Sequence, residues 1–223
     1  MAGYKGVGKD TAAAYFLNRK RDGRWVKLAF ADKLKEFAYR LNPWLRAPVP
    51  GGRGLYTFYS LAGLVDEIGW DEAKLLPEVR KFLQECGTEA GRATLGRQVW
   101  IDAGFRDLPL FISTNIVVSD GRFENEYTAS VEEHMKRNFT RNGFYALWLT
   151  RIGHDGDGHS SETDELRRYC QDVPNNGTVE ELHLRLQKIV FPKETPHNDI
   201  DNQPFYLPRA AARRLQQTSC ETP

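Results

Sequence analysis

Short, almost wholly apolar runs alternate along the chain with longer stretches in which apolar positions recur every three or four residues. Three of the short runs predict strands: 25–30 (WVKLAF), 115–119 (NIVVS) and 144–149 (FYALWL). Runs of this length and continuity are typical of strands that are buried on both faces of a parallel sheet. A last short strand is predicted at 172–173.

The stretches with helical spacing predict helices. Their expected ranges are 9–20, 31–41, 61–76, 78–92, 97–105, 125–137, 163–169 and 178–190. Gly69 is expected to break the third helix, Pro77 to start the fourth and Thr178 to cap the last. Residues 43–59 are rich in proline and glycine and therefore predict a loop.

The order of these elements sets the fold class. Strands that alternate with helices predict an α/β fold with a central parallel sheet and right-handed crossovers. We expect one domain at 1–192, with a helical insertion at about 43–112 and a lid-like loop at about 151–163. Residues 193–223 are polar and repeatedly broken by proline, and they predict a tail.

Composition narrows the cellular setting. The 223 residues carry a formal net charge of +1, which gives no overall attraction to nucleic acid or to a membrane surface. No apolar run approaches the length of a membrane span. Cys86, Cys170 and Cys220 lie far apart and are odd in number, which predicts reduced thiols and a cytoplasmic location. We therefore expect neither a nucleic-acid nor a membrane partner.

Residues 3–11 (GYKGVGKDT) form the motif with the clearest chemistry, G-x-x-x-x-G-K followed by Asp-Thr. Glycines let the backbone turn so that several N–H groups point into one concave space, and the following helix adds the positive end of its dipole. The candidate phosphate-binding residues are Gly3, Lys5, Gly6, Gly8, Lys9, Asp10 and Thr11. The alternative is a glycine-rich turn that merely caps a helix, with Asp10 favouring the helix N-terminus.

The stretch ahead of this loop is short. A phosphate-binding loop ordinarily follows a buried strand of about five apolar residues. Here only Met1 and Ala2 precede Gly3, and the sequence therefore predicts that the first strand of the sheet is missing. Two explanations are open: a start further upstream, or a remnant that binds nucleotide without catalysis.

Charged residues follow the predicted strands at their carboxyl ends, the edge at which ligands bind in parallel sheets. These residues are Asp32, Lys33, Asp120, Arg122 and Arg151. Asp120 is a candidate magnesium ligand, and Arg122 is a fork-shaped partner for a phosphate. The structural alternatives are that Asp32 caps a helix, that Asp120 caps a turn, and that Arg122 pairs with Glu124 or Glu126.

The segment 84–92 is unusual for a helix. Two glycines beside threonine, glutamate and arginine weaken a helix unless something approaches it closely. We interpret it as an acceptor-binding segment, with Arg92 on a phosphate and Gln84 or Thr88 near a base or sugar. Trp100, which follows, is predicted to belong to the core rather than to stack on a base.

Several stretches together resemble the phage-type deoxynucleoside monophosphate kinases. They are GYKGVGKDT (3–11), FADKLKE (30–36), LQECGTEAGR (83–92), VVSDGRFENE (117–126) and DGHSSE (157–162), with NNGTVEEL (175–182) similar to the family's ending. The resemblance implies a three-layer P-loop kinase fold. It also implies that ATP and Mg²⁺ bind at the glycine loop and that a deoxynucleoside monophosphate is phosphorylated to the diphosphate.

The resemblance assigns roles to the candidate residues. The implied catalytic residues are Lys9, Arg122 and Arg151. The implied substrate-binding residues are Asp32, Lys33, Gln84, Thr88, Arg92 and Asp120, and the implied magnesium ligands are Thr11 and Asp120. Arg151 and the loop at 153–162 resemble a lid that closes over the transferring phosphoryl group.

Two further questions stay open in the sequence. A kinase of the same fold that acts on another small phosphate acceptor is the alternative within the enzymes. Whether the chain forms a homodimer is not decided by any residue pattern. The resemblance places the protein in the cytoplasm, which is that of the host if the chain is phage-encoded.

Overall fold

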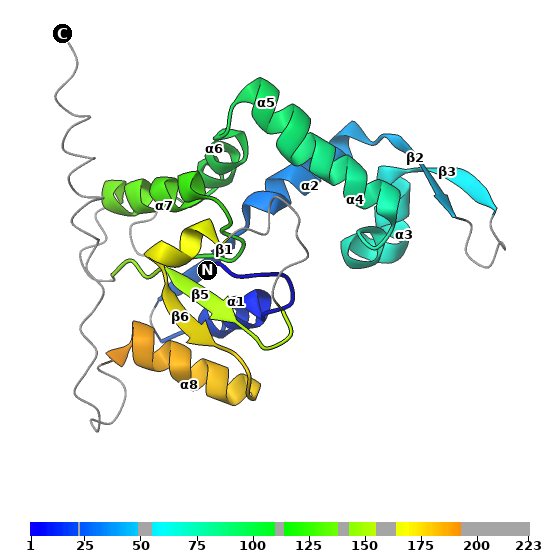
Figure 1. The fold of residues 1–223 in the computed structure, drawn as a ribbon. Helices are drawn as coiled ribbons and strands as arrows, with labels where there is room; N and C mark the ends of the chain where they lie inside the picture. Colours follow the sequence, from blue (N-terminus) through cyan, green and yellow to red (C-terminus); the bar gives the residue numbers. More distant parts are fainter. Residues whose placement is uncertain (22, 49–54, 110–113, 138–142, 155–163, 193–223) are drawn as a thin grey trace, which may run out of the picture.

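The computed structural model describes residues 1–21, 23–48, 55–109, 114–137, 143–154 and 164–192. Within these ranges the chain is a mixed α/β protein with parallel strand pairs and helices packed around them (Figure 1). Most of the predicted lid, at 155–163, and the predicted tail, at 193–223, lie outside the described residues. Across the same ranges, no helix is both long and apolar enough to cross a bilayer.

The predicted strands pair in parallel. β1 (Arg24–Leu28) lies beside β4 (Thr114–Val118), and β5 (Leu147–Thr150) lies beside β6 (Gln171–Pro174). All four expected strands are therefore present. The first ends two residues earlier than predicted, because the next backbone groups already belong to the start of a helix.

Met1 and Ala2 stand between the two strand pairs. The Ala2 N–H donates to the Leu147 carbonyl at 2.8 Å, and the Leu149 N–H donates to the Ala2 carbonyl at 2.9 Å. On the other side, the Met1 α-amine donates to the Val118 carbonyl at 2.6 Å. The prediction of one continuous sheet is wrong to this extent: two two-stranded sheets are bridged by two residues where a strand would run.

Helices cover both faces of these strands. On one face, α1 (Lys9–Leu17) and α8 (Val179–Val190) share an apolar core with the strands. Phe16 from α1, Leu186 from α8 and Val117 from β4 are all buried in it. This core supports the glycine loop, which leads directly into α1 (Figure 1).

The opposite face carries α2 (Phe30–Leu41), α6 (Val99–Arg106) and α7 (Glu124–Lys136). A second apolar core forms there, and Trp100 from α6 packs in it together with Val118 from β4. The prediction that Trp100 belongs to the core is therefore confirmed.

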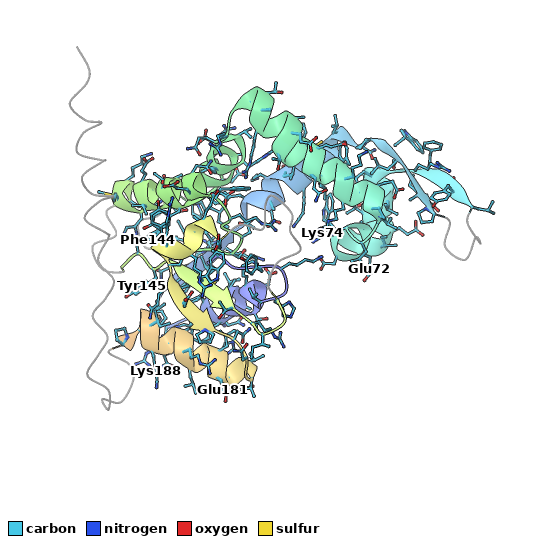
Figure 2. All side chains as sticks on the ribbon, viewed as in Figure 1. Glu72, Lys74, Phe144, Tyr145, Glu181 and Lys188 are labelled. Atoms are coloured by element: carbon cyan, nitrogen blue, oxygen red, sulfur yellow. The ribbon has the colours of Figure 1, made fainter. Side chains whose placement is uncertain are left out.

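The start of α8 is the predicted cap. The Thr178 hydroxyl accepts the Glu181 N–H at 3.3 Å, and the Glu181 carboxylate accepts the Thr178 N–H at 3.2 Å. Figure 2 labels Glu181 on α8. This reciprocal pair satisfies two backbone donors that a helix start leaves open. The short helix predicted at 163–169 is a 3₁₀ turn, η2 (Glu165–Tyr169).

The body of the insertion is formed by α3 (Leu61–Ala73) and α4 (Pro77–Gln84). α3 bends at Gly69, whose φ of 78° and ψ of 164° interrupt the helix as predicted. Leu61 and Val79 are fully buried in a third apolar core, which is separate from the two cores at the strands. The insertion therefore has its own packing, and it projects from the strands in Figure 1.

The stretch 43–59 is more than a loop. β2 (Trp44–Pro48) and β3 (Tyr56–Ser60) form an antiparallel hairpin, and residues 49–54 between them lie outside the described residues. The loop prediction gave weight to the prolines and glycines and overlooked the aromatic run at 56–59, which favours a strand.

The helix predicted at 78–92 changes its winding beyond α4. It continues as a π-helical turn, η1 (Glu85–Ala90), and a short helix, α5 (Gly91–Leu95). A β-carbon on Gly87 would lie 2.7 Å from the Leu34 side chain, so this glycine lets η1 approach α2 closely. Single π turns are rare and are found mostly at functional sites.

Candidate functional site

The glycine loop bends three times before α1 begins. Gly3, Gly6 and Gly8 have φ values of 133°, 82° and 96°, which lie in the left-handed region that side chains disfavour. The loop therefore requires glycine at each of these positions. It delivers the chain to the N-terminus of α1, where the helix dipole favours an anion.

Lys9 folds back over this loop. Its Nζ donates to the carbonyl oxygens of Gly3 and Tyr4, both at 2.7 Å. The ammonium thus lies across the loop at the start of α1 rather than extending into solvent. A phosphate that entered the loop would meet this charge together with the helix N-terminus.

Neighbouring side chains hold the loop in place. The Asn175 amide donates to the carbonyl of Val7 at 2.9 Å, and Val7 is completely buried. His154 Nδ1 lies 3.1 Å from the carbonyl of Lys5. A β-carbon on Gly6 would lie 2.6 Å from the His154 ring, so the loop and this ring are in direct contact.

Lys27 connects the loop with the strand ends. Its Nζ is 2.8 Å from the Asp10 carboxylate in the first turn of α1. The hydrogen bond that Lys27 donates to Asp10 and the charges of Asp10, Asp32 and Asp120 raise the pKa of Lys27, against the effect of burial. Of these three predicted acids, Asp10 is the one in direct contact with the ammonium. Thr11, one residue after Asp10, is exposed to solvent.

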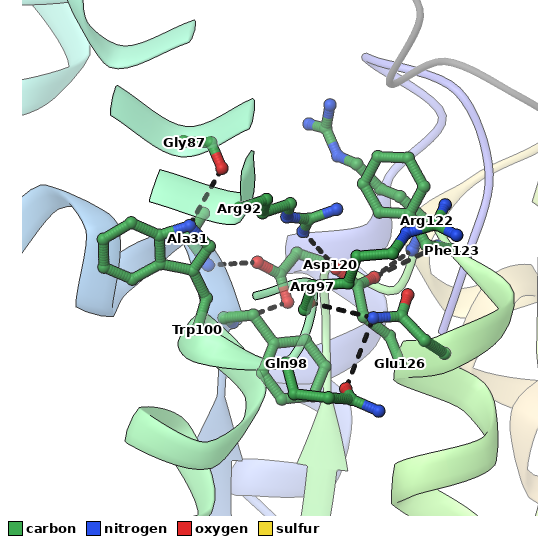
Figure 3. A network of polar contacts seen from close by, with 12 residues as sticks. Ala31, Gly87, Arg92, Arg97, Gln98, Trp100, Asp120, Arg122, Phe123 and Glu126 are labelled. Atoms are coloured by element: carbon green, nitrogen blue, oxygen red, sulfur yellow. Dashed lines mark hydrogen bonds and ion pairs between the residues drawn. The ribbon is translucent and has the colours of Figure 1, made fainter. Parts of the chain in front are cut away.

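Asp120 ties β4 to α2. Its two carboxylate oxygens accept the N–H groups of Phe30 at 3.0 Å and Ala31 at 2.8 Å (Figure 3). Burial raises the pKa of Asp120, while these two donors and the charge of Arg122 oppose the rise. Asp120 therefore caps the start of α2. Each of its carboxylate oxygens keeps a second lone pair, which can accept a hydrogen bond from a water or a ligand.

The described residues contain no group of three or more histidine, cysteine, aspartate or glutamate side chains placed to hold a metal ion. Such a group is not what Mg²⁺ ordinarily uses beside a nucleotide. It binds through one or two protein ligands together with waters and phosphate oxygens. The residues present, Asp120 and the exposed Thr11, fit that limited donor set.

Arg92 and Glu126 form a partly enclosed ion pair next to this end of β4. Arg92 Nη2 donates to Glu126 Oε1 at 2.9 Å. Glu126 Oε2 accepts the backbone N–H groups of Arg122 at 2.7 Å and Phe123 at 3.1 Å, which fixes the start of α7. Burial raises the pKa of Glu126, against the opposing effects of these donors, while the nearby Asp120 charge raises it further.

One donor of Arg92 is left without a partner. The guanidinium lies over the Phe123 ring, 4.2 Å from its centroid, and its Nε is buried without a hydrogen bond to any described residue. A buried donor without an acceptor is costly. The site around Arg92 in Figure 3 therefore has an unused hydrogen-bond donor that an anionic ligand would satisfy.

The π-helical turn shapes the wall beside Arg92. The Trp100 indole N–H donates to the carbonyl of Gly87 at 3.0 Å, which occupies a backbone acceptor inside η1 (Figure 3). Thr88 in this turn is exposed, and Gln84 just before it is half-buried. The structure thus places both predicted acceptor residues next to the Arg92 segment without engaging them in the contacts described here.

Lys33 is already paired with carboxylates on the surface of α2. Its Nζ contacts Glu36 at 2.8 Å and also Asp107, and these bonds raise the pKa of Lys33. Asp32 is paired in the same way with Lys35, at 2.6 Å. Either predicted residue has to exchange such a partner before it binds a ligand.

Arg151 directly follows β5 and is exposed. Its carbonyl accepts the His154 N–H at 3.1 Å, and the Asn176 side chain accepts the N–H of Ile152 at 2.8 Å. The first turn of the predicted lid therefore rests against the glycine loop and the end of β6.

Sequence reasoning missed three supporting residues. The sequence predicts Glu126 only as a partner of Arg122, whereas it accepts the Arg92 guanidinium. Asn175 stands within the stretch 175–182 that resembles the kinase family, and His154 stands within the lid-like loop, but neither is predicted to hold the glycine loop. The available signal is the Asn-Asn-Gly that follows the last predicted strand, at the sheet edge where the loop is expected.

Outside this site, the arrangement of helices and strands among the described residues does not by itself indicate a function. Comparison of the chain with the models of known protein families and with curated proteins finds no match, so a function has to rest on the geometry of the site.

Proposed function

We propose that this chain is an ATP-dependent kinase that phosphorylates a nucleoside monophosphate, with deoxynucleotides as the expected acceptors. The observation that carries the proposal is the loop of three left-handed glycines closed by Lys9 at the start of α1. A loop with this geometry suits the β- and γ-phosphates of a nucleotide. The same sequence and fold class are compatible with another small phosphate acceptor.

On the donor side, Lys9 would exchange its two carbonyl contacts for phosphate oxygens. In both of these contacts only the donor is charged, whereas a bond from the ammonium to a phosphate oxygen joins two opposite charges. The N-terminus of α1 adds its dipole to the same phosphate. Asn175 and His154 keep the loop in the shape that these contacts need.

On the acceptor side, Arg92 is the strongest candidate for a phosphate ligand. Glu126 holds its guanidinium in place through Nη2, and Nε is buried without a hydrogen bond to any described residue. Gln84 and Thr88 border this position and suit a base or sugar. Arginine is preferred over lysine at such sites because its planar fork matches a phosphate.

The reaction itself needs positioning and charge neutralisation rather than a nucleophilic side chain. A phosphate oxygen of the acceptor attacks the γ-phosphorus of ATP. A new P–O bond forms on that side, the bond from the γ-phosphorus to the β,γ-bridging oxygen breaks, and ADP leaves. Mg²⁺ supplies charge neutralisation on the β- and γ-phosphates when it is bound. Lys9, Arg122 and Arg151 neutralise the equatorial oxygens.

The proposal is tested by ADP release from Mg·ATP with each deoxynucleoside monophosphate in turn. We expect turnover that requires one or more acceptors and falls at least about a hundredfold in Lys9→Ala. Lys188→Ala, an exposed lysine near the end of α8, is the matched control (Figure 2). Folded protein that binds no ATP would contradict the proposal.

A nucleotide-binding protein without catalysis is the second candidate. The observation that favours it is the two-residue bridge behind the loop, which gives the loop less support than a full strand. ATP binding that is lost in Lys9→Ala, without turnover on any acceptor, would favour this candidate over the kinase.

A further inference from the structure

A seam of small and apolar residues runs along one side of the helix that leads from α4 into α5. Its members stand four positions apart and are buried or half-buried: Val79, Leu83, Gly87 and Gly91. Four residues of a regular α-helix turn about 400°, so such a seam drifts by about 40° at each step and by about 120° between Val79 and Gly91. Yet Gly87 faces Leu34 of α2, and Gly91 faces Trp100 of α6, which packs beside α2.

The π-helical turn η1 removes most of this drift. The Gly91 N–H donates to the Cys86 carbonyl, five residues back, whereas an α-helix would use the Gly87 carbonyl, four residues back. The wider turn takes up one extra residue, which rotates everything beyond it back by about 100° relative to α4. The seam therefore stays against α2 and α6 on both sides of η1.

Trp100 binds the carbonyl that this exchange leaves behind. Its buried indole N–H donates to the Gly87 oxygen at 3.0 Å (Figure 3). This bond compensates the Gly87 carbonyl for the α-helical bond from Gly91, and a buried polar group that loses its partner is costly. A β-carbon on Gly91 would lie 2.8 Å from the Trp100 ring, so the ring also packs closely against the turn that follows.

The winding of η1 sets the direction of Arg92. Arg92 follows Gly91 by one position, and its Nη2 meets Glu126 Oε1 of α7 at 2.9 Å. If η1 were wound as an α-helix, Arg92 would be rotated by about 100° at a radius of roughly 5–6 Å, which is a displacement of about 8 Å. A displacement of that size separates Arg92 from Glu126. The ion pair therefore depends on the π turn.

We propose that Trp100 is a positioning residue for the acceptor phosphate: its indole N–H holds the Gly87 carbonyl and keeps the π turn wound, and the turn aims Arg92 at Glu126 and at the acceptor. The part that concerns the acceptor rests on the proposed kinase function. Trp100 belongs to the core beside β4 and acts through Arg92.

The structural step is tested without a nucleotide. A double-mutant cycle of Arg92→Gln and Glu126→Gln in denaturant unfolding measures the coupling between the two side chains. The cycle is repeated in Trp100→Phe, which keeps an aromatic ring but has no N–H, and we expect the coupling to fall by at least about half. Ile101→Val, in the same core, is the matched control and should leave the coupling unchanged. Equal coupling in the parent and in Trp100→Phe would overturn the proposal.

The geometry also predicts a rescue. Deletion of Ala90, an exposed residue at the end of η1, removes the extra residue and allows an unbroken α-helix that carries Arg92 in the same direction. In Trp100→Phe the deletion should restore the coupling, and in the parent it should leave the coupling at roughly its original value. The parent deletion does not alter the core, so it decides the question even if Trp100→Phe does not fold. Loss of the coupling in that folded deletion variant would overturn the proposal.

The acceptor step is tested by steady-state kinetics with each deoxynucleoside monophosphate that the parent turns over. We expect Trp100→Phe to raise the acceptor KM about tenfold, to leave the KM for ATP unchanged, and to add nothing further in Arg92→Lys. Deletion of Ala90 should reverse the rise. A rise in both KM values, or effects that multiply in the double variant, would show that Trp100 does not act through Arg92. A parent without turnover would contradict the kinase proposal alone, because the coupling cycle decides the role of Trp100 without a nucleotide.

Discussion

Arg92 and Glu126 form an ion pair that is almost closed to solvent: Nη2 and Oε1 are 2.9 Å apart, and the two side chains are 16% and 3% exposed. The pair joins the helical insertion to the start of α7 across 34 positions of sequence. It fixes the guanidinium of Arg92, whose Nε is buried without a hydrogen bond to any described residue. The ion pair gives Arg92 a structural role, and the proposed phosphate contact would be a second role of the same side chain.

This relationship predicts that the two roles of Arg92 can be separated. Arg92→Ala leaves Glu126 buried without its cation and should cost about 3 kcal/mol in the free energy of unfolding. Arg92→Lys keeps the charge but loses Nε and the planar contact with Phe123. We expect Arg92→Lys to stay folded and to raise the KM for the acceptor at least about tenfold.

The measurement combines denaturant unfolding with steady-state kinetics at saturating ATP. Arg106→Lys, an exposed arginine of α6, is the matched control. An unchanged acceptor KM in well-folded Arg92→Lys would show that Arg92 acts only in the structure.

Asn175 is predicted to support the glycine loop from behind. Its amide donates to the Val7 carbonyl in a buried setting, so Asn175→Ala leaves that acceptor unsatisfied and should cost about 1–3 kcal/mol of stability. The loop should also lose its shape, and ATP should therefore stabilise the variant less than the parent in thermal unfolding. Asn176→Ala is the control, because Asn176 is exposed and binds only the N–H of Ile152 among the contacts described here.

Gly6 and Gly69 form a second matched pair. Both have positive φ, 82° and 78°, so alanine is strained at either position, and at Gly69 the ψ of 164° lies in a region that is essentially confined to glycine. A β-carbon on Gly6 would in addition lie 2.6 Å from the His154 ring, whereas one on Gly69 meets nothing within 4 Å. We expect both variants to lose stability and only Gly6→Ala to lose ATP affinity as well.

Titration calorimetry with ATP and Mg²⁺ measures that difference. The double variant Gly6→Ala/His154→Ala should recover part of the affinity if the ring contact is responsible. Equal ATP affinity in Gly6→Ala and Gly69→Ala would place the phosphate site elsewhere.

These glycines also show how far the sequence determines the site. The four parallel strands, the bend at Gly69 and the Thr178 cap all depend on local signals: continuous apolar runs, a glycine inside a helical pattern and a hydroxyl at a helix start. Each such signal acts within about one turn or one strand. The corresponding predictions were therefore correct in place and type.

The missed features depend on contacts between distant segments. The hairpin at 44–60 forms although the stretch between its strands is rich in proline and glycine, and its aromatic residues lie opposite residues of the other strand, as Tyr59 does with Leu45 and Phe58 with Arg46. Glu126 binds Arg92 from a different element, and no spacing along the chain indicates that pair. Likewise, the π turn at 85–90 arises from glycines that pack against Leu34 and Trp100, both of which come from other helices.

The Met1 α-amine supplies the last prediction, which concerns pH. Burial lowers the pKa of this amine below its ordinary value of 8.0, so folding favours the uncharged form. A folded-state pKa below the unfolded value stabilises the protein above pH 8, and this stabilisation is lost as the pH falls through the folded-state pKa. We therefore expect Tm to fall between about pH 9 and about pH 6, and this part of the fall to vanish in the N-acetylated chain.

The groups that act on the amine besides burial are Cys170, Asp120 and Lys9. Burial raises the pKa of Cys170 to about 11, so its thiol stays neutral across this window. Groups that the acetylation does not alter contribute equally to both forms of the chain and cancel in the difference between the two Tm curves. Parallel curves for the free and acetylated chains would mean that the amine is solvated in solution and does not donate to the Val118 carbonyl.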